Sequence, residues 1–522
     1  MDSLPPASSI SKRLLRCYQQ GGTRALHEIQ GSFSLILYDT SKQLTLLYRP
    51  FLNGLPLYFV HAEGVLNAAS NPLDILSRND LTSSLDKLEL ARIFRCMSTR
   101  WQETVFSEIS AVKHGEMLLI TAAGIECHTA DMEKLLPELK FSSREQAITD
   151  YRVLLENAVL KQLQPGRQHA VMLSSGLDSS SLAVLANRHL TKPPLMAISW
   201  SLPGDKGGDE SEQIAAICKS LKIPLHLFDG NSYGPFDQLE DSWLLPETPF
   251  TNPFGLITNA VYQHAEAHGV EVLLNGNFAD VLIPGMRYIF SDILRDHHYG
   301  LLLPVLRSQI KRYGWRKLRK SPVLKGLLPQ RQRQLVFKPE AWMPMGAGVY
   351  ADLHKQESQR ILQSPAYERF ATALSPFQSG YPGMDQYLSG PHNLRRIEPH
   401  RDIELLNFSL RLPAYWHYRN GQMKAFIREA LQGWLPENIR LQPRAGDLSG
   451  LVQRSFSRNR GEVRERLLDD PVDWSPYVDT RWMEQRLSDT DPINYRDALL
   501  VWQSLNLQSW KAAIKPGGRL FR

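Results

Sequence analysis

Residues 169–186 place a short apolar run, a polar turn and a helix-like run in immediate succession. His169–Leu173 is apolar and short enough for a buried strand, and Ser181–Ala186 has the composition of a helix. Between them the sequence reads LSSGLDSS, at residues 173–180. Strand-to-helix turns in open α/β sheets bind anions, because the free N–H groups at the helix start face the crevice. This turn therefore predicts an α/β sheet with an anionic ligand beside it.

The residues of the turn suit a pyrophosphate held with a metal ion. No lysine follows the glycine, so the turn is not a Walker A loop. Gly176 can adopt a positive φ that turns neighbouring N–H groups into an anion nest. Asp178 would repel a phosphate unless it holds Mg²⁺, although it could also be an ordinary helix N-cap. Hydroxyl donors come from four serines, Ser174, Ser175, Ser179 and Ser180.

The hydrophobic pattern changes near residue 140. Between 31 and 123, short β-like runs such as 32–38 and 44–48 are separated by turn residues. A capping box formed by Ser142 and Glu145 then opens a helical stripe. We predict a β-rich domain over residues 1–140 and an α/β domain over residues 141–522.

The α/β domain is predicted to contain a doubly wound parallel sheet. Strand-like runs recur at 169–173, 194–200 and 270–275, with helices between them. One of these helices opens on a D-x-x-E box from Asp209 to Glu212. Beyond about residue 290 the pattern is mostly helical.

The composition is that of an ordinary globular protein: 43% of the 522 residues are hydrophobic and 22% are charged. The net charge of +6 allows an acidic partner but does not require one on so long a chain. The four cysteines form no C-x-x-C pair, which argues against a disulfide framework or a zinc site. No stretch approaches the roughly 18 apolar residues of a membrane span. We therefore expect a cytoplasmic protein with no membrane partner.

The turn S-S-G-L-D-S-S resembles the S-G-G-x-D-S pyrophosphate loop of ATP pyrophosphatases, with Ser175 in place of the first glycine. Over about residues 25–450 the chain resembles the asparagine synthetase B family, which includes β-lactam synthetases and lasso-peptide cyclases. The resemblance implies a second metal carboxylate after a later strand, and Asp280 fits the G-x-x-x-D-x-L element that begins at Gly276. It also implies adenine contacts at Ile198 and Ser199, just before Trp200.

Further matches lie towards the C-terminus. Residues 398–402 resemble the P-F-L-D helix start, where Asp402 is either an N-cap or a ligand contact. Residues 421–428 resemble a G-x-x-K-x-x-x-R element, which makes Lys424 a candidate catalytic cation; the alternative is a solvated basic face shared with Arg428.

The R-P-K-x-G block of the family corresponds to residues 442–446. Arg444 stands at the position of a lysine that stabilises charge during amide formation, and Gln442 stands at the arginine position. Arginine supplies a fixed positive charge but cannot relay a proton. The tyrosine and glutamate of β-lactam synthetases fall at Asn277 and Arg395, so no general base is assigned.

The first domain resembles a glutaminase domain, with G-D-F-A-like and R-D-x-x-G-like blocks at 31–39 and 48–58. The family uses a cysteine directly after the initiator methionine, whereas this sequence has Asp2, and its first cysteine is Cys17. We expect a truncated, degenerate domain that does not hydrolyse glutamine. Arg49, which resembles a glutamine-carboxylate ligand, is then expected to be structural or a relic.

Residues 307–333 carry ten lysines and arginines and no acidic residue. This basic segment is either a solvated helical face or a docking strip for a precursor peptide and its processing protein. Nucleic acid is not expected as a partner.

The resemblance implies an ATP-dependent, AMP-forming ligase with Mg²⁺ held by Asp178 and Asp280. A carboxylate would become an acyl-adenylate, and an amine would then displace AMP to form an amide. A lasso-peptide macrolactam cyclase fits the basic segment best. The alternatives are an ammonia-using asparagine synthetase and a degenerate homologue that binds nucleotide or peptide without catalysis.

Overall fold

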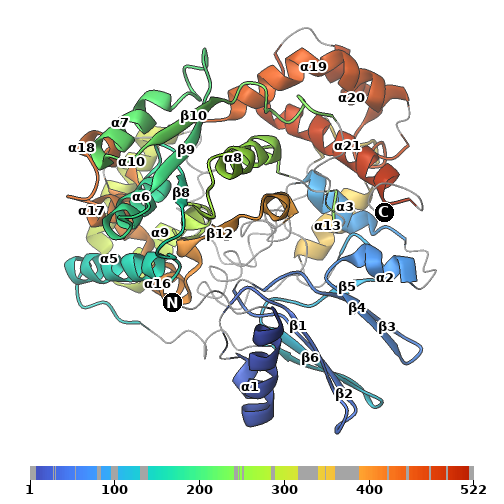
Figure 1. Cartoon of the computed structure of the whole chain (residues 1–522). Coiled ribbons are helices and arrows are strands. Elements are labelled where there is room, and N and C mark those ends of the chain that lie inside the picture. The colour runs from blue at the N-terminus through green and yellow to red at the C-terminus, as the bar shows by residue number, and fades with distance from the viewer. Residues whose placement is uncertain are drawn as a thin grey trace. The chain divides into compact units, whose positions relative to one another are not determined.

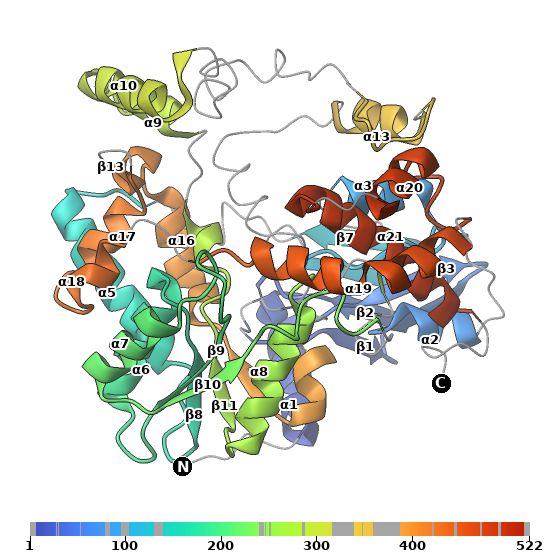
Figure 2. The same cartoon turned by 90° about the horizontal axis from the view of Figure 1, so that it is seen from above.

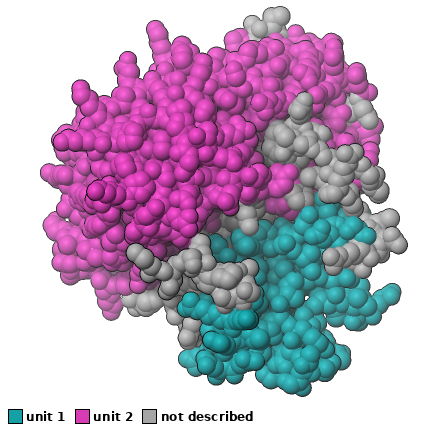
Figure 3. Space-filling model, viewed as in Figure 1, with its two compact units in different colours: residues 1–86, 99–138 teal, residues 87–98, 139–522 magenta. Residues whose placement is uncertain are grey.

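The chain forms two compact units, one of residues 1–86 and 99–138 and one of residues 87–98 and 139–522 (Figure 3). No helix within the described residues is long and apolar enough to cross a membrane. The computed structural model describes residues 7–27, 29, 31–52, 54–78, 84–95, 104–129, 139–239, 245, 247–249, 252–283, 288–315, 339–346, 348–358, 387–419, 422–442, 446–469, 472–488 and 492–515.

The first unit is β-rich, as its alternating pattern predicts. One antiparallel sheet has the order β1-β2-β6-β7, with β1 at Leu35–Asp39, β2 at Leu44–Tyr48, β6 at Glu116–Thr121 and β7 at Gly124–Thr129. A second has the order β4-β3-β5, with β3 at Tyr58–Ala62, β4 at Val65–Ala69 and β5 at Ser110–Ala111. Helices α1 (Ala7–His27) and α2 (Pro72–Arg78) belong to the same unit.

Strand β2 is buried on both faces, which places it in the middle of this unit. Leu46 and Tyr48 pack with Leu26 of α1, whereas Leu47 packs with Leu118 on the other side. This split follows from the two-residue period of a strand.

Arg49 directly follows β2 and is 8% exposed. Its guanidinium donates to the carbonyls of Gly54, at 3.2 Å, and Val112, at 3.1 Å. These bonds join the chain after β2 to the segment before β6, so Arg49 has a structural role here.

The second unit is built on the predicted doubly wound sheet. All five strands are parallel, in the order β10-β9-β8-β11-β12. Their bounds are His169–Met172 for β8, Met196–Ser201 for β9, Leu225–Asp229 for β10, Val272–Leu274 for β11 and Arg395–Ile397 for β12. The order of the strands along the chain reverses between β8 and β11, which makes this pair the switch point of the sheet.

Helices cover both faces of this sheet (Figures 1 and 2). α6 (Leu177–His189) and α7 (Ser211–Leu221) lie on one face, and α8 (Gly255–Ala267) lies on the other. α5 (Arg144–Leu160) packs against α6. This arrangement buries both faces of a sheet whose strands read as continuous apolar runs.

Two predicted capping boxes need correction. The N-cap of α5 is Ser143, one residue after Ser142, and its side chain accepts from Gln146 N at 3.0 Å. At α7 the carboxylate of Asp209 accepts from Ser211 N at 3.0 Å, while Glu210, the N-cap residue, makes no capping bond with its side chain. Both helices begin near the predicted positions; another serine caps α5, whereas at α7 the predicted residue Asp209 does accept from the first turn although the N-cap position is Glu210.

The remainder of the second unit is mostly helical. Its helices are α3 (Lys87–Phe94), α9 (Ile289–Arg295), α10 (Leu302–Tyr313), α13 (Gly348–Ser358), α16 (Ile403–Arg411), α17 (Ala425–Ala430), α18 (Glu437–Arg440), α19 (Ser449–Asp469), α20 (Thr480–Ser488) and α21 (Tyr495–Ala513). A short hairpin of β13 (Tyr418–Arg419) and β14 (Gln422–Met423) precedes α17. α19 packs against α20 and α21.

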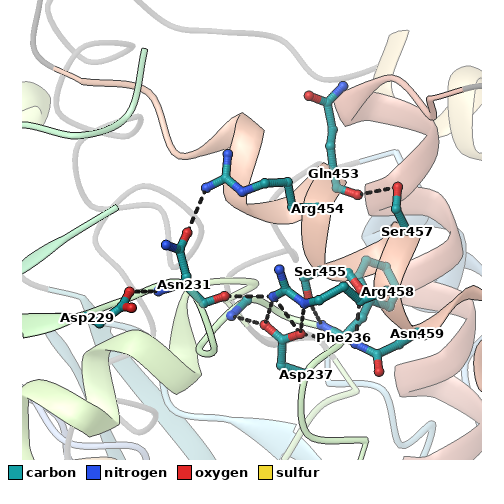
Figure 4. Close-up of polar contacts among 11 residues, drawn as sticks. Asp229, Asn231, Phe236, Asp237, Gln453, Arg454, Ser455, Ser457, Arg458 and Asn459 are labelled. Carbon is teal, nitrogen blue, oxygen red and sulfur yellow. Dashed lines mark hydrogen bonds and ion pairs between the residues drawn. The ribbon is translucent and has the colours of Figure 1, made fainter. Parts of the chain in front are cut away.

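An ion pair and hydrogen bonds join helix α19 to the loop that follows β10 (Figure 4). The guanidinium of Arg458 pairs with Asp237 at 2.7 Å and donates to Asn231 O at the same distance. The hydroxyl of Ser455 accepts from Phe236 N at 2.8 Å. Phe236 and Ser455 are fully buried, so this hydroxyl is the acceptor for an amide that water does not reach.

Replacing Ser455 with alanine should lower the free energy of unfolding by about 1–3 kcal/mol, because the buried Phe236 N–H loses its acceptor. Urea denaturation measures the change. Ser457→Ala is the matched control on α19: Ser457 is exposed, its hydroxyl donates to Gln453 O, and its loss should cost less than about 0.5 kcal/mol. Equal effects of the two substitutions would show that Ser455 does not hold the loop.

Candidate active site

The candidate site lies where strands β8 and β11 end. The LSSGLDSS turn follows β8, and residues 275–282 follow β11. Because the two strands are parallel neighbours, their carboxyl ends lie at the same edge of the sheet. Crevices at such a switch point are the usual ligand sites of doubly wound sheets.

The serines of the turn shape it by bonding to one another. The Ser174 and Ser179 hydroxyls lie 2.9 Å apart, and Ser179 Oγ also accepts from Ser174 N at 3.0 Å. The hydroxyl of Ser174 accepts from Gly176 N at 3.2 Å, and that of Ser180 donates to Ser174 O at 3.4 Å. Hydrogen bonds among its own serines therefore fix the conformation of the turn.

Gly176 is the N-cap residue of α6, and its backbone differs from the expected left-handed conformation. Its φ is −68° and its ψ is 155°, so it is extended. No side-chain bond caps this helix start. The first N–H groups of α6, a helix of 13 residues, thus remain for an anion, and the helix dipole favours one there. The anion-binding potential comes from the helix start rather than from a left-handed glycine.

Gly276 lets the loop of residues 275–282 lie directly against the LSSGLDSS turn. A Cβ atom at this position would lie 2.9 Å from Ser179 N and 3.1 Å from Ser179 Cα. A glycine is needed here because both close atoms belong to the backbone. Asp280 then lies in a 3₁₀ turn, Ala279–Leu282, after Phe278, whose φ is +74°.

Lys424 joins the two candidate metal carboxylates. Its ammonium lies 2.7 Å from Asp178 Oδ2 and 2.7 Å from Asp280 Oδ1. Lys424 has a left-handed backbone, with φ at +61°, at the start of α17. Burial lowers the pKa of Lys424, but attraction to both carboxylates outweighs burial and raises it above the ordinary value.

The two carboxylates fit a divalent cation bound together with phosphate. Asp178 and Asp280 can share one positive group, as their contacts with Lys424 show. No cluster of three or more His, Cys, Asp or Glu in the described part of the chain could hold a metal by itself. Mg²⁺ is bound in this way, by one or two carboxylates completed by phosphate oxygens and water.

A buried histidine lies close enough to these charges to interact with them. His400 is 2% exposed, and its Nδ1 atom has no hydrogen-bond partner among the described residues. Burial lowers the pKa of His400 to about 4, and the charges of Asp178, Lys424 and Asp280 modify that value. His400 is therefore neutral at neutral pH. The sequence pattern gave this residue no role.

A pocket of about 180 Å³ opens beside the turn, within the second unit. Trp200 lies on its wall, at the end of β9. Ile198 is fully buried in the sheet, and its carbonyl accepts from Leu173 N at 3.1 Å. Ser199 lines the pocket, but its hydroxyl donates to Leu173 O at 2.7 Å. The described residues that line the pocket are Ser174, Ser199, Trp200, Gly208, Glu210, Ile214, Gly446 and Leu448.

Three other residues that the sequence analysis singled out are Asp402, Arg428 and Arg395. Asp402 is an N-cap that accepts from Glu404 N and Leu405 N at 3.0 and 3.2 Å. Arg428 is buried and donates to Arg440 O, so it does not share a solvated face with Lys424. Arg395 lies on β12, where burial lowers its pKa.

Two predicted features lie partly or wholly outside the described residues. Arg444 belongs to the interval 443–445, which is not described, although Gln442 and Gly446 on either side of it are. Of the basic segment, only residues 307–315 are described, and α10 carries its first cations, Arg307 and Lys311.

Known proteins match both units. The asparagine synthase family model matches residues 150–512, and a glutamine amidotransferase domain model matches residues 7–130. Asparagine synthetase [glutamine-hydrolyzing] 3 of Bacillus subtilis is 23% identical over 445 residues, which are 83% of this chain and 69% of that protein.

Two further relatives match over shorter stretches. Amidase chyE of Penicillium rubens is 24% identical over 55% of this chain, and asparagine synthetase B [glutamine-hydrolyzing] of Escherichia coli is 22% identical over 53% of it. The matches span 45% and 47% of the lengths of these two relatives.

Replacing Gly276 with alanine should lower the free energy of unfolding by about 1–3 kcal/mol, because the new Cβ must push the two loops apart. Chemical denaturation measures this, and amide exchange in residues 173–180 should become faster. Gly300→Ala is the control, because a Cβ at exposed Gly300 would meet nothing within 4 Å. Similar stability of the two variants would contradict the close approach.

His400 should make the protein less stable in acid. Its pKa is lower in the folded protein than in the unfolded chain, so the unfolded chain binds more protons between about pH 6.5 and pH 4. The stability that neutral His400 contributes is present above this window and is lost as the pH falls through it. Between pH 7 and pH 5 the loss should be about 2 kcal/mol.

Urea denaturation of the wild type and of His400→Phe at both pH values isolates this contribution. The difference in stability between pH 7 and pH 5 should shrink by that amount in the variant. An unchanged pH dependence would show that His400 does not titrate as proposed.

Proposed function

The chain belongs to the asparagine synthase family, and we propose on this premise that it is an ATP-dependent ligase that joins a carboxylate to an amine. AMP and pyrophosphate are the other products. The observation that carries this proposal is the convergence of Asp178 and Asp280 on Lys424 beside the uncapped start of α6. The support is chemical: three charged groups and a helix N-terminus suit a polyphosphate with its metal ion.

In the first step, a substrate carboxylate oxygen attacks the α-phosphorus of ATP, and the bond to the β-phosphate breaks. The α6 start and the hydroxyls of the turn receive the β- and γ-phosphates, which leave as pyrophosphate. Asp178 and Asp280 would hold Mg²⁺, which supplies positive charge to the departing pyrophosphate. Lys424 adds a fixed ammonium at the same place.

The pocket beside the turn suits the nucleoside of ATP. Trp200, Ile214 and Leu448 give it apolar walls for a base, and Glu210 adds a carboxylate. A nucleoside in this pocket would lie next to the turn that is proposed to hold the phosphates. We assign Ser199 to its wall and Ile198 to the backbone that supports it.

In the second step, an amine attacks the acyl-adenylate, its proton leaves, and AMP departs as the amide forms. Arg444 is assigned the role of stabilising the charge that develops there. Its guanidinium stays charged at any working pH, so it can stabilise negative charge but cannot transfer a proton.

We further propose that the substrate is a peptide and that the product is the macrolactam of a lasso peptide. The support is the basic segment 307–333, which would attract an acidic precursor peptide or its processing protein. The domains are assigned as 1–140, a degenerate glutamine amidotransferase type 2-like domain, and 141–522, the synthetase domain, in line with the two family matches.

Mass spectrometry of reactions with Mg·ATP tests these assignments. A candidate peptide with a free N-terminus and an internal Asp or Glu should lose one water while AMP and pyrophosphate appear. Conversion of aspartate and ammonium to asparagine would instead favour the synthetase alternative. Nucleotide binding without AMP formation from any carboxylate would favour a non-catalytic homologue.

Asp178→Ala and Asp280→Ala should each reduce AMP formation on the order of 100-fold or more, because each removes one of the groups that stabilise the leaving pyrophosphate. Circular dichroism should show both variants folded. Asp229→Ala is the control, because Asp229 ends β10 of the same sheet and is exposed. Normal turnover in either site variant would remove the proposed magnesium site.

A further inference from the structure

The carboxylate of Glu210 is bound to two segments that are far apart in the sequence. Its Oε1 atom accepts from the Ser175 hydroxyl at 2.5 Å, and its Oε2 atom accepts from Ser175 N at 3.2 Å. Gly446 N also donates to Oε1. The side chain of Gln442 completes the group, because its Nε2 atom donates to Ser175 Oγ at 3.1 Å. The carboxylate of Glu210 thus joins the LSSGLDSS turn to Gly446, and the Ser175 hydroxyl joins the turn to Gln442.

We infer that Ser175, Glu210, Gln442 and Gly446 form a latch that positions the phosphate-binding turn against Gln442 and Gly446. This inference rests on the proposed function, since it assigns Glu210 as a positioning residue for that reaction. The latch would hold the groups of the adenylation step and the amide-forming step in one geometry.

The contacts of Glu210 are not those of a helix cap. Glu210 is the N-cap residue of α7, yet its side chain does not bond to the first turn of that helix. Asp209 provides the acceptor there. The Glu210 side chain is therefore available for the turn, and it reaches it at the wall of the nucleoside pocket.

The fit at Gly446 is tight. A Cβ atom at Gly446 would lie 2.7 Å from Glu210 Cγ and 2.9 Å from its Cδ. A side chain at position 446 would therefore force the Glu210 side chain to move from this contact. This close approach indicates a defined contact between the two segments.

A second set of bonds holds the loop that carries Glu210. Arg454 of α19 pairs with Asp205 at 2.7 Å, and Asp447 N donates to Gly207 O at 3.2 Å. Residues 205–210 are thus attached to residues 446–454 along their length. The latch extends this attachment to the turn itself.

Two members of the latch stand where the sequence departs from the S-G-G-x-D-S and R-P-K-x-G motifs of the family. Ser175 replaces a glycine and Gln442 replaces an arginine, and the two side chains are in contact. A glycine at 175 would remove the hydroxyl that links Gln442 to Glu210. Arginine is longer than glutamine and pairs with carboxylates through its forked guanidinium, so we expect an arginine at 442 to pair with Glu210 in place of the contact through the serine. The two departures therefore compensate for each other.

A double-mutant cycle tests this compensation. Ser175→Gly and Gln442→Arg should each lower kcat/KM for AMP formation on the order of tenfold, because each breaks the chain of hydrogen bonds. The double variant should regain activity to within about threefold of the wild type, because arginine then pairs with Glu210. A double variant as impaired as the product of the two single effects would overturn the inference.

Hydrogen–deuterium exchange without substrate provides a readout that does not depend on turnover. Each single variant, and Glu210→Gln, should speed exchange in residues 173–182 and 442–452, and the double variant should restore protection. Glu212→Gln is the control, because Glu212 is exposed in the first turn of the same helix α7. Unchanged exchange in Glu210→Gln would overturn the latch.

Binding of an ATP analogue with an uncleavable α,β-methylene bridge separates the latch from a competing explanation. The latch predicts weaker binding in Glu210→Ala, because the turn loses its position. Tighter binding would show that Glu210 competes with phosphate for Ser175 N, which would overturn the inference. If the wild type forms no AMP from any carboxylate, the proposed ligase fails while the exchange result still decides the latch.

Discussion

The ammonium of Lys424 between Asp178 and Asp280 is the interaction on which the rest of the site depends. It brings together the start of α6, the loop after β11 and the start of α17. Lys424 is partly buried, which by itself lowers its pKa, and attraction to the two carboxylates raises that pKa above the ordinary value. The same convergence creates the concentration of charge that a polyphosphate and its metal need.

The parallel sheet makes this convergence possible. Strands β8 and β11 are neighbours because the strand order reverses between them, so the two loops that carry the carboxylates leave the same edge. Gly276 then allows backbone to approach backbone at Ser179. The ion pairs of α19 with Asp205 and Asp237 hold the loops that follow β9 and β10.

Much of this arrangement was predictable because it is local in the sequence. The apolar run, polar turn and helix at 169–186 encode β8, its turn and α6, and so place Asp178, whereas Asp280 was identified through the resemblance to the G-x-x-x-D-x-L element. The prediction was wrong where several polar neighbours could serve the same local purpose. Ser143 rather than Ser142 caps α5. Gly176 is extended rather than left-handed, and the hydroxyls of Ser174 and Ser179 bond to each other across the turn.

By itself, the sequence determined which segments become strands and helices, and which carboxylates stand at the strand ends. Only the tertiary structure decided their partners. Nothing in the local pattern distinguishes Lys424 from Arg428, yet one faces two carboxylates 246 and 144 positions away while the other binds backbone carbonyls. Likewise Glu210 lies within the predicted Asp209–Glu212 box, and its partners Ser175 and Gly446 come from distant parts of the sequence. The physical reason is that periodicity and caps act over a few residues, whereas a buried charge is paired only when distant segments meet.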